Sequence, residues 1–115
     1  MGTIRLLHYP GMAAQGEEED VGISAHTDFE AITFMHQNSP GLQFIARDTG
    51  EWVDAPVYPS DFVVMVGDVM ERFTNGVLRA TPHRVVRTPH SRSSIVRFLA
   101  VHPDTIIAPL PEFVT

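Results

Sequence analysis

The chain has 115 residues, a formal net charge of −6 and no cysteine. Disulfides and thiolate metal sites are therefore excluded, and any metal must be held by histidine, carboxylate or other oxygen ligands. The acidic balance argues against a nucleic-acid partner, which would need a basic face. No apolar run approaches the roughly 20 residues that cross a membrane. We expect one domain over residues 1–115, in a soluble and cytoplasmic protein.

Charge is spread unevenly along the chain. There is no lysine, and six of the eight arginines lie between Arg72 and Arg97. An anionic small molecule would be attracted to this half of the chain. Residues 17–20 form an acidic run, which we interpret as part of a solvated loop because blocks of like charge are usually exposed.

Short segments rich in valine, isoleucine, phenylalanine and threonine recur between turn-forming residues, which is typical of an all-β sandwich or barrel. In chain order, we expect strands at Ile4–Tyr9, Gly22–Thr27, Ala31–His36, Leu42–Ala46, Trp52–Asp54, Phe62–Val66, Thr81–Arg87 and Ser94–His102. Asp48-Thr49-Gly50 predicts a hairpin turn, and the spacing within Gly67–Phe73 predicts at most one short helical turn. Eight short strands favour a double-sheet jelly roll, with ligand sites at its mouth.

His26 and Asp28 are two residues apart, so on an extended strand they present an imidazole and a carboxylate side by side. His83 can complete the set. Two histidines and one carboxylate on one face of a metal form the facial triad of non-heme Fe(II) oxygenases, with the remaining positions left open. Taken alone, the His-x-Asp pattern also fits a surface histidine beside an aspartate, because short patterns arise by chance.

Arg92 and Ser94 are also two residues apart on a predicted strand, so a guanidinium and a hydroxyl face the same side. Val96 and Phe98 continue this row, and we interpret Phe98 as core packing. A planar guanidinium can hold a carboxylate through two parallel hydrogen bonds, which lysine cannot do. The pair therefore predicts a clamp for an acidic cosubstrate.

In their order and spacing, these motifs resemble the Fe(II)- and 2-oxoglutarate-dependent dioxygenases, in the branch similar to isopenicillin N synthase, flavonoid oxidases and gibberellin oxidases. The resemblance covers nearly the whole chain. It is carried by residues 5–10, 25–28, 41–43, 51–53, 66–68, 74–76 and 83–85 and by the Arg92-x-Ser94 pair.

The resemblance implies a double-stranded β-helix of the cupin-like kind and a role for each matching residue. His26, Asp28 and His83 would be the catalytic Fe(II) ligands, and Arg92 and Ser94 would hold the distal carboxylate of 2-oxoglutarate. Tyr9 would assist the cosubstrate or substrate; its alternative role is a buried aromatic with a satisfied hydroxyl. The implied cofactors are Fe(II), 2-oxoglutarate as cosubstrate and O2, with ascorbate as an optional addition. The implied reaction hydroxylates or desaturates a small organic molecule and releases succinate and CO2.

Other polar residues are interpreted as structural. His8, His36, His90 and His102 lack a partner at ligand spacing. Arg84 follows His83 and faces away from it, so we expect a structural salt bridge. Asp68 is expected to be a cap or turn carboxylate.

Members of this branch are considerably longer, with an N-terminal helical portion that packs on one sheet. The chain therefore resembles the catalytic core of a larger protein or a fragment. Ile95, Leu99 and Val101 are expected to face away from Arg92, where an N-terminal helical region or self-association would cover them. Ser24 stands where the flavonoid-type enzymes have a carboxylate, so flavonoid specificity is not expected.

Two alternatives stay open beside the dioxygenase hypothesis. One is an oxidase of the same superfamily that does not use 2-oxoglutarate, because such relatives keep the Arg-x-Ser pair for a different carboxylate. The other is a non-catalytic jelly-roll fragment that retains a structural metal. An open metal site beside an anion clamp favours catalysis, since a binding module needs neither.

Overall fold

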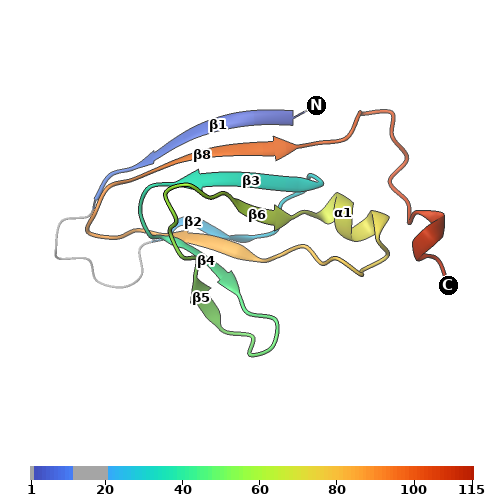
Figure 1. Ribbon diagram of the computed structural model, residues 1–115, viewed down its shortest axis with the longest axis horizontal. Helices are drawn as coiled ribbons and strands as arrows, with labels where there is room; N and C mark the ends of the chain where they lie inside the picture. The colour runs from blue at the N-terminus through green and yellow to red at the C-terminus, as the bar shows by residue number, and fades with distance from the viewer. Residues whose placement is uncertain (1, 12–20) are drawn as a thin grey trace.

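The computed structural model describes residues 2–11 and 21–115, so the acidic run at residues 17–20 lies outside the described residues. Two four-stranded antiparallel sheets pack against each other (Figure 1). In chain order the elements are β1 (Gly2–Tyr9), β2 (Val21–His26), β3 (Ile32–Gln37), β4 (Leu42–Ile45), β5 (Trp52–Asp54), β6 (Val63–Val66), α1 (Asp68–Phe73), β7 (His83–Val86), β8 (Arg92–Leu99) and the 3₁₀ turn η1 (Pro111–Phe113). The eight predicted strands and the helical turn are present, with ends that differ from the expected ones by at most three residues. The turn η1 is absent from the prediction.

The first sheet has the strand order β1-β8-β3-β6 and the second has the order β2-β7-β4-β5. Successive strands therefore alternate between the two sheets, except that β4 and β5 are neighbours in one sheet. This winding is the jelly roll that the sequence predicts. The β4–β5 hairpin turns with Gly50 at a φ of 71°, a left-handed conformation that glycine adopts without a steric penalty.

The core lies between the sheets and receives alternate side chains from each strand. Its buried apolar members are Met35, Leu42, Ala55, Met65, Val85 and Val96. Burial alternates along β3 and along the first half of β8. Arg92 and Ser94 therefore face the interior, in one row with Val96.

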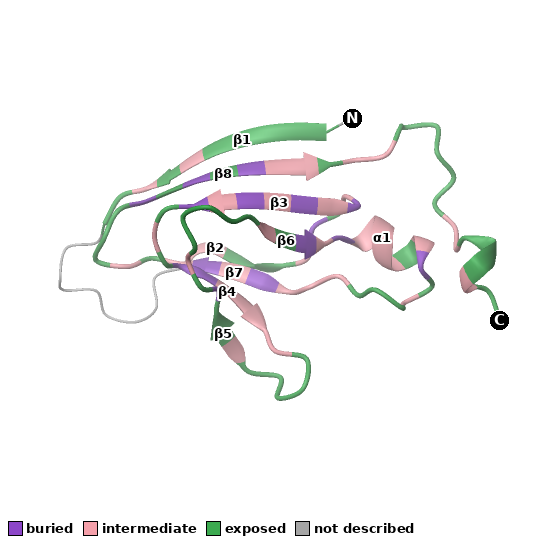
Figure 2. Ribbon diagram, in the orientation of Figure 1, coloured by how far each residue is buried: buried purple, intermediate pink, exposed green. Residues whose placement is uncertain are grey.

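The opposite face of the β1-β8-β3-β6 sheet is apolar and exposed. Leu6 is 77% exposed and Ile4 is 63% exposed, and Figure 2 shows β1 as exposed over most of its length. Ile95 and Leu99 lie on this outer face, as the alternation predicts. Val101 does not belong to it, because β8 ends at Leu99 and Val101 is only half-exposed. The sheet thus leaves an apolar surface without a covering element among the described residues.

Helix α1 begins one residue later than expected and ends in a tight turn. Gly67 is its N-cap, and Asp68 is its first residue and makes no capping bond, so the expected capping role of Asp68 is wrong. Asn75 has a φ of 50°, and its side-chain Nδ2 donates to the backbone oxygen of Phe113. The turn therefore also holds the C-terminal segment beside the helix. No helix among the described residues is long and apolar enough to span a membrane.

Candidate metal centre

The two candidate histidines lie on neighbouring strands. His26 ends β2, His83 begins β7, and the two residues are paired across the sheet. Asp28 lies in the loop that follows β2, not on the strand itself. His26 and Asp28 do lie side by side, as expected, although Asp28 lies beyond the end of the strand.

The three side chains converge on one point. Asp28 Oδ1 lies 3.3 Å from His26 Nε2 and 3.4 Å from His83 Nε2. The ring centroids of the two histidines are 4.4 Å apart. One ligand atom from each residue lies within 4.8 Å of the other two. A single metal ion can therefore contact all three groups.

The hydrogen bonds of the histidines fix which ring nitrogen faces the carboxylate. His26 Nδ1 donates to the backbone oxygen of Ser24 at 2.7 Å, and His83 Nδ1 donates to that of Thr81 at 2.8 Å. Since a carbonyl only accepts, the proton of each neutral ring is on Nδ1 and the Nε2 lone pair points at Asp28. With both rings neutral, three electron-rich atoms face one another, and either a bound metal ion or a proton on Nε2 that is shared with Asp28 stabilises this arrangement.

The charge states agree with a cation site. Burial raises the pKa of Asp28, but hydrogen bonds with His83 and Thr33 outweigh it and hold that pKa below its ordinary value. Burial lowers the pKa of His83, but its contacts with Asp28 and the Thr81 carbonyl raise it overall. The centre therefore keeps an ionised carboxylate that attracts a positive ion.

The loop that carries Asp28 is held from two sides. Thr33, a buried residue of β3, donates its hydroxyl proton to Asp28 Oδ2. At the start of α1, the backbone N–H of Asp68 donates to the Asp28 carbonyl at 2.7 Å, and that of Gly67 donates to the Ala31 carbonyl at 2.9 Å. A Cβ at Gly67 would lie 1.9 Å from the Glu30 oxygen, so only glycine allows this close approach. Sequence reasoning missed Thr33; the clue available was a hydroxyl residue in the same alternating row as Met35.

A second polar cluster lies deeper between the sheets. Arg92 is only 2% exposed, its Nη2 donates to Gln37 Oε1 at 2.9 Å, and its Nε donates to the Ser39 carbonyl at 3.2 Å. No ion pair formed by the described residues includes Arg92. A buried charge without a counter-charge is costly, so this guanidinium fits an anionic ligand. Gln37 orients it and was not among the predicted site residues.

Three buried donors of this cluster have no hydrogen-bond partner among the described residues: Tyr9 Oη, Arg92 Nη1 and Ser94 Oγ. Tyr9 and Arg92 are paired across β1 and β8, and the guanidinium carbon lies 5.3 Å from the Tyr9 ring centroid. Burial raises the pKa of Tyr9 despite the opposing charge of Arg92, so its hydroxyl keeps its proton. Buried polar groups are normally satisfied; three orphaned donors together fit one carboxylate.

One cavity reaches from the metal-ligand cluster towards the polar cluster around Arg92, because Tyr9 is part of its lining. Its volume is about 110 Å³, and it is lined by His26, Asp28 and His83 together with Tyr9. The rest of its lining is mainly apolar and includes Met35 and Val96. The structure thus brings the candidate iron ligands and Tyr9 to one cavity.

The remaining polar residues make contacts outside this space. His8 bonds to Ser93 Oγ and His36 to the Pro59 carbonyl, each at 2.9 Å. Arg84 lies 4.2 Å above the Trp52 ring and donates to Gln43 Oε1. These contacts fit structural roles for all three residues, and the salt bridge expected of Arg84 stays a prediction.

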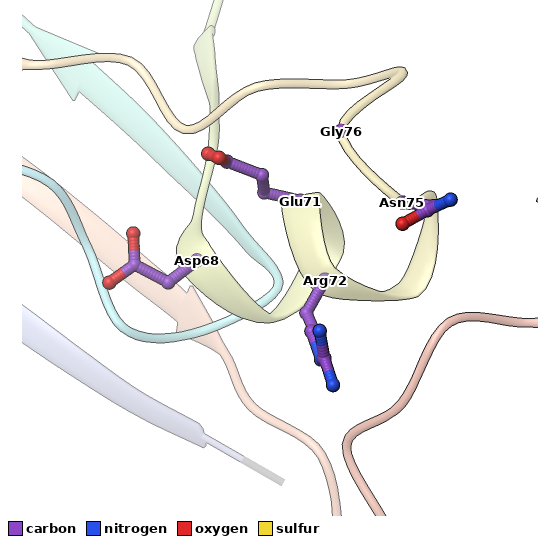
Figure 3. A pocket seen from close by; sticks show the side chains of 5 residues that line it. All are labelled: Asp68, Glu71, Arg72, Asn75 and Gly76. Atoms are coloured by element: carbon purple, nitrogen blue, oxygen red, sulfur yellow. The ribbon is translucent and has the colours of Figure 1, made fainter.

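A separate hollow of about 340 Å³ lies beside α1 and contains none of the candidate ligands. Figure 3 shows Glu71 and Arg72 leaving the helix on opposite sides. Glu71 Oε2 accepts a hydrogen bond from the Ala80 N–H at 2.6 Å. This carboxylate therefore fixes the segment before β7, and hence His83, by a backbone contact.

Comparison with known proteins identifies the family. The 2OG-Fe(II) oxygenase superfamily model matches residues 2–101. A 2-oxoglutarate-dependent dioxygenase from Didymella fabae is 42% identical over 106 residues, which cover 88% of this chain and 32% of that protein. A homoarginine-6-hydroxylase from Glycine max is 34% identical over 114 residues, which cover 94% of this chain and 34% of that protein.

The fold is also similar to a solved structure, that of a full-length Neurospora crassa protein in complex with alpha-KG. The TM-score is 0.89 at 31% identity, over 96% of this chain and 36% of that one. The chain therefore belongs to the 2OG-Fe(II) oxygenase superfamily, and the predicted family and jelly-roll fold are confirmed. The relatives are consistent with the isopenicillin N synthase-like branch. The chain spans about a third of the length of the relatives that it matches.

The residues present fit both groups for which this family is named. Two imidazoles and one carboxylate are a donor set that Fe(II) accepts while keeping open positions. The orphaned donors of Tyr9, Arg92 and Ser94 are the complement of a buried carboxylate, such as one end of 2-oxoglutarate.

Proposed function

We propose that this chain is the catalytic core of an Fe(II)- and 2-oxoglutarate-dependent dioxygenase that hydroxylates or desaturates a small organic molecule, with release of succinate and CO2. One observation carries the proposal: the three residues with convergent metal-ligand atoms line the same cavity as Tyr9, whose hydroxyl is an orphaned buried donor. A structural metal site would not need unpaired donors beside it.

In this proposal each side chain has a defined role. His26, Asp28 and His83 hold Fe(II), and Arg92 and Ser94 hold the distal carboxylate of 2-oxoglutarate. Bound together, the two groups supply the oxidising chemistry, in which 2-oxoglutarate is decarboxylated to succinate. Ser24 and Thr81 carbonyls keep the imidazole lone pairs on the metal side. The apolar walls of the cavity limit access of water to the centre.

The test is an anaerobic titration of the protein with Fe(II) and 2-oxoglutarate, in which the metal-to-ligand charge-transfer band of the chelate is recorded. We expect the band in the wild type and its loss in His26→Ala. Arg92→Ala should weaken 2-oxoglutarate binding far more than Fe(II) binding. His102→Ala is the matched control, since this histidine side chain is 66% exposed and its contacts within the described part of the chain are with Asp104. A band that survives His26→Ala would show that the ligand assignment is wrong.

A second candidate is an oxidase of the same superfamily that binds no 2-oxoglutarate. The orphaned donors fit any carboxylate of suitable size, so they are compatible with a substrate carboxylate in the same place. Measuring succinate formation together with oxygen uptake separates the two. Oxygen uptake without succinate in active protein favours the oxidase, and a metal-binding protein that consumes no oxygen is the non-catalytic fragment.

We also propose that a further element covers the apolar outer face formed by Ile4, Leu6, Ile95 and Leu99. The exposure of these side chains and the short span of the chain relative to its relatives support an N-terminal helical region; self-association is the alternative. The size of the chain in solution, measured with and without an added N-terminal extension, distinguishes these two. Cytoplasmic location stays a prediction.

A further inference from the structure

A second and larger hollow opens on the same metal centre from outside. Its volume is about 460 Å³, and its walls include His26 and Asp28, two of the three candidate iron ligands. The other lining residues are Thr3, Arg5, Thr27, Phe29, Glu30 and Phe98. The proposed 2-oxoglutarate donors are not among them, so this cleft offers a separate approach to the metal.

Arg5 stands at the boundary between this open cleft and the enclosed cavity, because it lines both. It is paired across the sheet with the buried Val96, and Leu7 and Tyr9 follow it on the inward row of β1. Strand alternation therefore directs Arg5 inward, at a position where its neighbour in the row is apolar. Arg5 is nevertheless exposed, so its guanidinium is open both to solvent and to a ligand in the cleft.

Within residues 2–11 and 21–115, no ion pair neutralises the charge of Arg5. Its guanidinium carbon lies 6.0 Å from the ring centroid of Phe98, within the range of a cation–π contact. Arg5 is thus held over an aromatic ring with its hydrogen-bond donors free for a ligand in the cleft.

The other lining residues of the cleft indicate the shape and charge of the rest of the ligand. Phe98 and Phe29 present aromatic surface, and Phe29 is 81% exposed. Glu30 is the one charged residue of the lining besides Arg5 and the ligand Asp28. A second anionic group would be repelled by Glu30, so a single negative charge fits best.

We infer that the cleft binds the primary substrate, and that this substrate is an organic monocarboxylate with an aromatic or other flat apolar body. Its carboxylate pairs with Arg5, and its body lies along Phe98 with a C–H group towards the metal centre. The inference rests on the proposed function, because it assigns the outer side of the same centre. The two arginines then have different partners, since Arg92 binds the cosubstrate and Arg5 binds the substrate.

The experiment uses 2-naphthylacetate and phenylacetate as probes, each with its neutral amide. The anaerobic protein is first loaded with Fe(II) and 2-oxoglutarate, and the charge-transfer band is recorded before any probe is added. Each probe is then titrated, and its affinity is taken from the perturbation of the band. In the wild type we expect each acid to bind about tenfold more tightly than its amide, as for one charge-assisted hydrogen-bonded pair.

Substitutions test whether Arg5 causes the tighter binding of the acids. Arg5→Gln should remove the preference for the acids and leave 2-oxoglutarate binding unchanged, and Arg5→Lys should retain part of it. Arg97→Gln is the matched control: it removes the same charge from β8, where Arg97 alternates with the inward-facing Val96. It should behave as the wild type.

Three results would overturn the inference: equal affinity for acids and amides in the wild type, failure of either acid to perturb the band, or an unchanged preference in Arg5→Gln. Loss of 2-oxoglutarate binding in Arg5→Gln would also overturn it, because Arg5 would then serve the cosubstrate. If the band never forms in the wild type, the proposed function itself fails and this inference with it. The spectrum recorded before the probe is added separates that failure from the others.

Discussion

The deep end and the open end of the barrel are built differently. At the deep end, Arg92, Gln37 and Ser94 are each at most 3% exposed and stand on the strands β8 and β3. At the open end, the His26 side chain is 41% exposed, and the neighbouring Phe29 belongs to a loop. The difference separates a preorganised end, where we propose that the cosubstrate binds, from the end proposed for the substrate, which loop changes can alter without disturbing the fold.

The largest effect is expected from a substitution at the deep end. Arg92→Met removes the buried guanidinium but keeps a side chain of similar length. We expect 2-oxoglutarate affinity to fall more than about 30-fold, since truncating one member of a buried charge pair costs about 2–5 kcal/mol. The ligand-free protein should lose little stability, because removal of a buried charge without a counter-charge offsets the loss of the hydrogen bonds to Gln37 and Ser39. Calorimetric titration and urea denaturation measure the two quantities.

Arg84→Met is the control for that pair of measurements. Arg84 packs over Trp52 and bonds to Gln43 within the β2-β7-β4-β5 sheet, to which Arg92 does not belong, so its loss should lower stability and leave 2-oxoglutarate binding intact. Unchanged 2-oxoglutarate affinity in Arg92→Met would contradict the division between the two ends.

The next largest effect is expected at Thr33, whose hydrogen bond holds the proposed metal ligand Asp28 between the two ends. Thr33→Val keeps the shape of the side chain but removes the hydroxyl that donates to Asp28 Oδ2. We expect Fe(II) affinity to fall by about 10–100-fold, the usual cost of losing such an outer hydrogen bond. Thr33→Ser should restore most of it. Equal losses in both variants would point to packing and not to the hydroxyl.

A smaller effect is expected where α1 meets the Asp28 loop. Gly67→Ala places a Cβ against the Glu30 carbonyl, so the loop must shift, at a cost of about 1–3 kcal/mol in unfolding free energy. Fe(II) binding should weaken as well. Gly50→Ala provides the comparison: its Cβ meets no atom within 4 Å, but its φ is 71°. It should lower stability through strain alone and leave Fe(II) affinity as it is.

The sequence predicted what depends on local pattern. The eight strands followed from short apolar segments and turn residues, and the pairing of His26 with His83 agrees with the motif spacing. The position of Asp28 could not be predicted from local pattern. Its loop is hydrogen-bonded to the start of α1, which lies 40 residues further along the chain (68 − 28). Such a long-range contact leaves no periodicity in the sequence.

The hydrogen-bond partners of the site residues could not be predicted from local pattern either. Thr33 and Gln37 lie on the predicted strand Ala31–His36 or directly after it, yet neither was assigned to the site. Their significance depends on which side chain faces them across the core, and that follows from the sheet topology. Arg5 was matched to the family motif, but only the fold places it at the mouth of the metal centre.

The smallest expected effect decides between the two roles of Tyr9. Its hydroxyl is buried and has no partner among the described residues, so the alternative of a hydroxyl satisfied within the protein lacks support from the structure. If the hydroxyl donates to the cosubstrate, Tyr9→Phe should lower 2-oxoglutarate affinity by about 0.5–1.5 kcal/mol, the net value of one hydrogen bond. Tyr58→Phe, at an exposed position, should change nothing. If Tyr9→Phe binds 2-oxoglutarate as well as the wild type, then Arg92 and Ser94 hold the carboxylate without it, and the phenol belongs to the core.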